Sequence, residues 1–160
     1  MKSFFPISLI LLALVLAGCS SASASSPGEA AVPLQGDADL NSSTDWGGQT
    51  PLLDEQGAVT AEITPLNLAN PGDALDFQVS LNTHSVDLSM NLTNLATLTT
   101  DTGKTVQAVT WDAPLGGHHV SGTLSFPASV DGVPVLEGVS KLTLTLVNVD
   151  VPERVFIWER

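Results

Sequence analysis

The residues from Gly57 to Arg160 alternate repeatedly between apolar and polar side chains. No stretch of this region has a convincing apolar stripe with a period of 3.6 residues, so the pattern predicts β-strands and not amphipathic helices. Roughly 100 residues are enough for one hydrophobic core and too few for two, so we expect one domain over residues 57–160. The alternating runs are ALDFQVSLN from Ala74, SVDLSMNL from Ser85, HHVSGTLSF from His118 and KLTLTLVNV from Lys141.

Residues that favour turns lie between these runs: NPGD at Asn70–Asp73, DTGK at Asp101–Lys104 and DG at Asp131–Gly132. Each supplies a residue that starts a turn or tolerates a positive φ, and we expect DTGK to close a hairpin with its glycine in the left-handed conformation. Seven or eight short strands at this spacing are typical of an antiparallel β-sandwich, immunoglobulin-like in the broad sense, and a small barrel is the alternative. The expected first and last strands are Val59–Thr64 and Arg154–Trp158.

The alternation changes phase in the middle of the region. Apolar positions are odd-numbered up to Leu81 and even-numbered from Val86. Such a change of pleat register needs a bulge or a corner. His84 lies at this point, where we expect the strand to kink and the side chain to be redirected.

The N-terminal sequence MKSFFPISLILLALVLAGCSS has the order and length of a secretory signal peptide. Lys2 precedes about 14 mostly apolar residues, which is short for a membrane span. The motif LAGC, Leu16–Cys19, resembles the lipobox of bacterial lipoproteins. The alternative is an ordinary cleaved signal or a short anchor helix in which Cys19 is only a small residue.

The lipobox resemblance implies that residues 1–18 are removed as a signal peptide and that Cys19 is acylated with fatty acids such as palmitate. Cys19 is the only cysteine of the chain, so it has no partner for an internal disulfide. Several acyl chains on one residue anchor a protein stably in a membrane. The resemblance also implies a place in the cell envelope, facing outside the cytoplasm, and Ser20 after the cysteine favours the outer membrane where the host has one.

Acidic residues outnumber basic ones, with 17 Asp and Glu against 5 Lys and Arg and a formal net charge of −12. Nucleic acid is therefore not an expected partner, because phosphate backbones need neutralising cations. Residues 19–56 are rich in Ser, Ala, Gly, Pro and Asp and have no sustained apolar period. Such a composition buries too little apolar surface to offset the entropy of ordering, so we predict a flexible tether between the lipid anchor and the sandwich.

All three histidines lie in two short segments, at His84 and at His118 and His119. Neutral imidazole is a common ligand of copper and zinc, and Asp87 could be a further ligand. Adjacent strand residues point to opposite faces, so we expect only one of His118 and His119 to face His84. Two hypotheses stay open: a copper or zinc site using His84 with His118 or His119 and Asp87, or histidines that hydrogen-bond backbone groups at strand ends.

Arg154 has the same parity as Phe156 and Trp158, which we expect to pack in the core. Its stem would then be drawn toward the sandwich edge, where Asp87 or Glu153 could pair with it. A solvated arginine is the preferred prediction.

The blocks THS from Thr83, GGHH from Gly116 and ER-x-F-x-W from Glu153, with Trp111 between the first two, resemble a family of uncharacterised prokaryotic proteins. Members of this family are secreted or membrane-attached and have a small β-sandwich. The resemblance implies the fold and the choice of residues, but no activity. The chain also lacks a G-x-S-x-G elbow and an H-E-x-x-H motif. We therefore expect a non-catalytic binding or interaction module with an envelope protein as partner, and metal binding is the alternative.

Lipidation of Cys19 is directly testable. Intact mass measurement of protein from a bacterium that processes lipoproteins should show cleavage before Cys19 and an added mass of fatty acids on that residue. Cys19→Ser should lose the added mass and leave the membrane fraction or keep its leader. A wild-type chain with an uncut leader, or with a free thiol at Cys19, contradicts the prediction.

Overall fold

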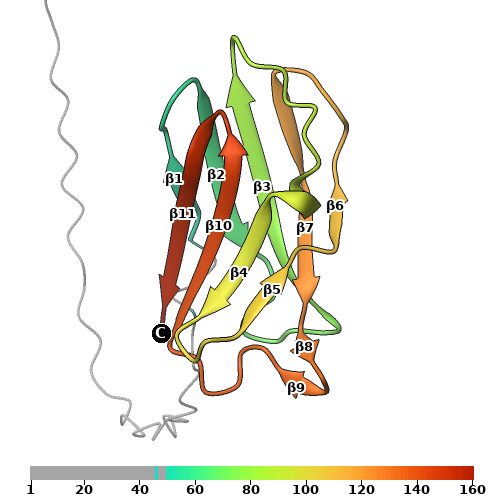
Figure 1. The fold of residues 1–160 in the computed structure, drawn as a ribbon, viewed down its shortest axis with the longest axis vertical. Coiled ribbons are helices and arrows are strands. Elements are labelled where there is room, and N and C mark those ends of the chain that lie inside the picture. The colour runs from blue at the N-terminus through green and yellow to red at the C-terminus, as the bar shows by residue number, and fades with distance from the viewer. Residues whose placement is uncertain (1–45, 47–49) are drawn as a thin grey trace, which may run out of the picture. The chain divides into compact units, whose positions relative to one another are not determined.

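The structure is a computed structural model that describes Trp46 and residues 50–160. The predicted signal peptide, the lipidation site at Cys19 and most of the predicted tether lie outside these residues. Within the described part of the chain, no helix combines the length and the apolar character needed to cross a membrane. The described residues form two antiparallel β-sheets and one small hairpin (Figure 1).

The first sheet contains five strands in the order β1-β2-β3-β7-β6, and the second contains four in the order β11-β10-β4-β5. The first sheet consists of β1 (Leu52–Asp54), β2 (Val59–Pro65), β3 (Ala74–Thr83), β6 (Thr110–Asp112) and β7 (His119–Pro127). The second consists of β4 (Ala96–Thr100), β5 (Thr105–Gln107), β10 (Lys141–Val149) and β11 (Val151–Glu159). The separate hairpin consists of β8 (Ser129–Val130) and β9 (Val133–Pro134). The predicted all-β antiparallel sandwich is confirmed, and the described residues form nine strands in its two sheets and two in the hairpin, where seven or eight strands were expected.

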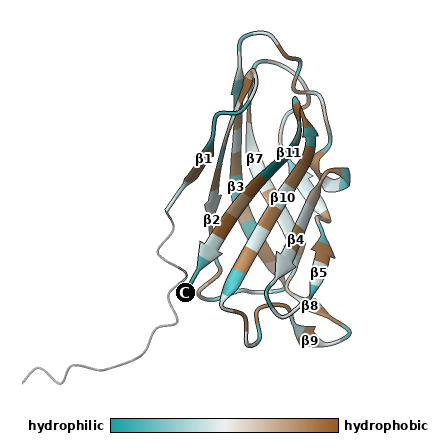
Figure 2. Ribbon diagram, turned by 60° about the vertical axis from the view of Figure 1, so that its left-hand side comes forward, coloured by the Kyte–Doolittle hydropathy of each residue, from teal (hydrophilic) through white to brown (hydrophobic). Residues whose placement is uncertain are grey.

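The hydrophobic core lies between the two sheets. On β3 every odd-numbered side chain from Leu75 to Leu81 is buried, as the alternation predicts. Phe77 of β3 packs against Phe126 of β7 and against Trp158 of β11, with ring centroids 5.7 and 5.4 Å apart, so the second contact joins the sheets. Each such fully buried side chain contributes about 1.5–3 kcal/mol to folding. Apolar and polar residues alternate along β10 as well, and Figure 2 shows them as brown and pale segments of that strand.

Two of the predicted turns connect paired strands. Asp101–Lys104 joins β4 to β5, and Gly103 has a φ of +85°, which confirms the predicted left-handed glycine. Asp131 and Gly132 join β8 to β9. Asn70–Asp73 lies in the longer loop between β2 and β3.

The predicted strand over Ser85–Leu92 is not formed. The chain leaves the sheet after Thr83, whose hydroxyl oxygen accepts hydrogen bonds from the backbone N–H groups of Ser85 and Val86, both at 3.3 Å. This local turn replaces the expected bulge. The segment then runs without strand pairing to a short 3₁₀ helix, η1 (Leu92–Asn94), while Leu88 and Leu92 remain buried. The alternation here therefore predicted burial correctly and secondary structure wrongly.

The ordered fold begins before Gly57, inside the range predicted as tether. Strand β1 pairs with β2 in the register Leu52↔Ile63. Trp46 is also part of the core, with 3% of its surface exposed, and the guanidinium of Arg160 lies 5.0 Å from its ring centroid. Trp46 and the short strand β1 escaped prediction because neither belongs to a segment with a sustained apolar period.

The strands run between two opposite ends of the sandwich (Figure 1). One end, here called the histidine end, carries the close of β3, the start of β7, the β1–β2 turn and the β10–β11 turn. The other, here called the entry end, carries the C-terminus with Trp46, the β2–β3 loop and the β4–β5 turn. The ten residues of β3 separate the ends by roughly 30 Å, at about 3.3 Å per residue.

Gly122 of β7 should be intolerant of any side chain. A Cβ at this position would overlap the carbonyl oxygen of Asp112 and the Cβ of Ala113, on the chain that leaves β6. Gly122→Ala should therefore lower the free energy of unfolding by at least about 2 kcal/mol in urea denaturation. Gly72→Ala is the matched control, because no atom lies within 4 Å of its added Cβ. Equal stabilities of the two variants would show that the β6–β7 approach is not tight.

Candidate functional site

Two loops of the histidine end are joined by backbone hydrogen bonds. The β3–η1 loop comprises residues 84–91, and the β6–β7 loop comprises residues 113–118. The N–H of Leu88 donates to the carbonyl of Gly117 at 3.1 Å, and the N–H of Gly116 donates to the carbonyl of Leu88 at 3.2 Å. The N–H of Thr83 donates to the carbonyl of His118 at 2.9 Å. The paired loops thus form one braced surface.

The glycine pair allows this bracing. Gly116 and Gly117 have φ values of +84° and +103°, which L side chains rarely adopt. The N–H of Gly117 also donates to a carboxylate oxygen of Asp87 at 3.3 Å, so Asp87 braces the loop pair.

His84 and His119 lie beside each other on this surface. Their ring centroids are 6.3 Å apart, and the ring planes are nearly perpendicular at 85°. Both side chains are exposed, as is that of His118. Of the adjacent histidines, His119 is thus the one whose ring meets His84.

A side chain holds the His119 ring in place. Nδ1 of His119 lies 2.8 Å from Oδ1 of Asn82, its directly opposite partner in the β3–β7 ladder. The structural hypothesis predicted hydrogen bonds to backbone groups, whereas this ring uses an amide side chain. Alternation places Asn82 on the outward face with Gln78 and Ser80, but its partnership with His119 depends on the register between two strands about 37 residues apart.

Of the four residues predicted as metal ligands, the structure brings only His84 and His119 together. In the part of the chain that the structure describes, no group of three or more His, Cys, Asp or Glu side chains is arranged to hold a metal ion. Asp87 bonds the backbone of Gly117. Met90, in the same loop, is half-buried and packs against the hydrophobic core.

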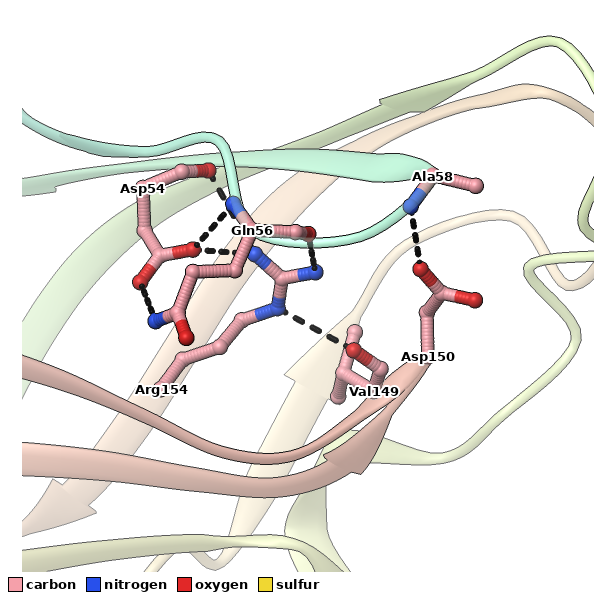
Figure 3. Close-up of polar contacts among 6 residues, drawn as sticks. All are labelled: Asp54, Gln56, Ala58, Val149, Asp150 and Arg154. Atoms are coloured by element: carbon pink, nitrogen blue, oxygen red, sulfur yellow. Dashed lines mark hydrogen bonds and ion pairs between the residues drawn. The ribbon is translucent and has the colours of Figure 1, made fainter.

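The prediction for Arg154 is wrong, because this arginine is fully buried. Its guanidinium forms an ion pair with the carboxylate of Asp54, and neither Asp87 nor Glu153 is its partner (Figure 3). Its remaining N–H groups donate to the carbonyls of Val149 at 3.1 Å and Gln56 at 2.7 Å. A buried charge with this many partners is compensated, which a solvated arginine would not need.

This ion pair ties the two sheets together at the histidine end. Arg154 belongs to β11, whereas Asp54 closes β1 and Gln56 lies in the β1–β2 turn. Asp150, in the β10–β11 turn, adds a second link, since its carboxylate accepts a hydrogen bond of 2.5 Å from the N–H of Ala58 (Figure 3). Burial alone would raise the pKa of Asp54, but hydrogen bonds from Gln56 and the charge of Arg154 outweigh it and lower that pKa below its ordinary value.

Comparison with known proteins gave one similar solved structure. No family model matches the chain, and no curated protein matches it. The similar structure is that of a DUF4426 family protein from Pseudomonas aeruginosa PAO1, with 12% sequence identity and a TM-score of 0.41. The match covers 68% of this chain and 94% of that protein. A similarity at this level carries no argument about what the chain binds.

Asp54→Asn should destabilise the fold in a pH-dependent way. Because folding lowers the pKa of Asp54, its carboxylate stabilises the fold at pH values above the ordinary pKa of 3.8, and this stabilisation is lost as the pH falls through the folded pKa. At pH 7 the free energy of unfolding of the variant should be about 1.5–3 kcal/mol lower than that of the wild type, because a charged hydrogen bond to buried Arg154 is lost.

Urea denaturation between pH 7 and about pH 3 should show the gap between wild type and Asp54→Asn closing as the pH falls. Glu55→Gln, at the exposed neighbouring position, is the matched control and should change stability little. A gap that stays constant over this pH range would contradict the role given to the Asp54 carboxylate.

Proposed function

We propose that this chain is a lipid-anchored, extracytoplasmic binding module that contacts an envelope protein through the histidine end of its sandwich and performs no catalysis. The anchor is Cys19, and the outer membrane is its place in hosts that have one. The observation that carries the proposal is that the paired loops of residues 84–91 and 113–118 lie at the end opposite the entry of the chain.

The position of Trp46 supports an outward orientation of the histidine end. Trp46 is the described residue closest in sequence to the predicted anchor. It is buried at the entry end, with the guanidinium of Arg160 over its ring. A tether that joins the sandwich there leaves the histidine end roughly 30 Å further from its attachment point. The loops that such a domain presents outward are the usual place for binding residues on a rigid β scaffold.

The surface of the paired loops suits contact with a protein. Leu115, at the tip of the β6–β7 loop, has 73% of its surface exposed, more than any other large hydrophobic residue described. The exposed His84 and His118 lie in the same two loops, and the exposed His119 begins β7 directly after them. An apolar side chain among polar groups on a braced backbone loses little conformational freedom on binding. The excess of carboxylates disfavours an anionic partner such as nucleic acid.

Site-specific crosslinking on intact cells tests this proposal. A photo-crosslinking amino acid in place of Leu115 should capture a defined envelope protein, and the same replacement at Glu137, exposed near the entry end, should not. Excess purified protein without the crosslinker should suppress the capture, and Leu115→Asp should weaken it about tenfold or more.

Equal capture from positions 115 and 137 would refute a specific histidine-end surface. Capture that is confined to position 115 but lost when Cys19 is replaced would show that the partner is reached only from the membrane.

A further inference from the structure

We propose that His84 and His119 together bind one divalent transition-metal ion, with copper(II) preferred, and that Asn82 orients the His119 ring for this purpose. The inference deepens the proposed function, because it names a ligand class for the histidine end. It depends on that surface being a binding site, but on neither the lipid anchor nor a protein partner.

Hydrogen bonding determines which nitrogen of His119 is free. Nδ2 of Asn82 lies 3.4 Å from the hydroxyl of Ser80, which directs Oδ1 of the same amide toward His119 at 2.8 Å. An amide oxygen only accepts, so Nδ1 of His119 carries the proton and donates. Nε2 of the neutral ring is therefore unprotonated and has a lone pair available for a metal.

This arrangement is the one that metal-binding histidines normally have. A ligating imidazole almost always donates its second N–H to an oxygen acceptor, which fixes the tautomer and the ring orientation. Here the acceptor is supplied by the opposite strand of a ladder, in the pair Asn82↔His119, and is therefore placed by backbone register. The role of Asn82 is that of a positioning residue, since it acts through His119.

The second imidazole is close enough to share an ion. Copper and zinc hold imidazole nitrogen at about 2 Å, so two ring centres that share one ion lie roughly 5–6 Å apart. The centroids of His84 and His119 are 6.3 Å apart in the structure. Both side chains are exposed, so a small rotation of either closes the difference.

The expected ion follows from the donor set. Two imidazole nitrogens leave the other coordination positions to water, and for such sites affinity rises along the series of divalent metals to a maximum at copper(II). The net charge of −12 also favours the accumulation of cations near the surface.

Titration of the full chain with CuCl2 tests the proposal. The chain carries Cys19→Ala to remove the only thiol, is kept in non-ionic detergent and has no histidine tag. It should bind one copper ion, and electron paramagnetic resonance should show coupling to two imidazole nitrogens. His84→Ala and His119→Ala should each reduce the coupling to one nitrogen and weaken binding at least tenfold, with ZnCl2 binding more weakly than CuCl2 throughout.

Matched variants separate the site from adventitious binding. His118→Ala should leave both the affinity and the two-nitrogen signal unchanged. Asn82→Ala should weaken copper binding about tenfold, and Asn82→Asp, which keeps an oxygen acceptor, should restore it. Thermal unfolding without metal should show that every variant is folded.

Copper binding that survives His84→Ala or His119→Ala, or that His118→Ala reduces equally, would overturn the site. An Asn82→Ala loss that Asn82→Asp fails to restore would overturn the positioning role. Protein capture from position 115 is measured without added metal, so it can fail or succeed independently of this result.

Discussion

The antiparallel pairing of β3 with β7 is the constraint on which the rest of the structure depends. The ladder runs from Ala74↔Pro127 to Asn82↔His119 at the centre of the five-stranded sheet. Side chains alternate with a period of two, so a slip of one residue between β3 and β7 would move either Phe77 or Phe126 from the core to the solvent. The same register that fills the core places Asn82 opposite His119 at the histidine end. Core packing and the arrangement of the candidate site are therefore consequences of one pairing.

Much of the fold could be predicted from the sequence, because long strands with one buried face have a strong period. The runs from Ala74, His118 and Lys141 became β3, β7 and β10. The run from Ser85 failed for a physical reason: a loop that crosses the end of a sandwich can bury every second residue without forming a ladder. Leu88 is buried in this way while its backbone bonds Gly117 of another loop. The alternation of a segment indicates which of its side chains are buried, but it does not indicate which other segment its backbone hydrogen-bonds.

The errors at Arg154 and in the predicted tether have a common origin. Parity placed Arg154 with Phe156 and Trp158 on the inner face, but a buried guanidinium is favourable only with partners for its charge and N–H groups. Those partners, Asp54 and Gln56, lie about 100 residues earlier in a segment whose composition resembles a linker. The pairing between histidines was similarly beyond the sequence, which indicated that one of His118 and His119 faces His84 but not which one.

The position of Trp46 has a mechanical consequence. A chain held at the entry end and loaded at the histidine end carries tension along the strand axes, perpendicular to the hydrogen bonds between β2, β3 and β7. Those bonds are then sheared together and share the load, whereas a pull across the sheet would break them one after another. For the tethered and partner-bound domain proposed above, this geometry would resist unfolding under the flow and stretching that a cell surface experiences.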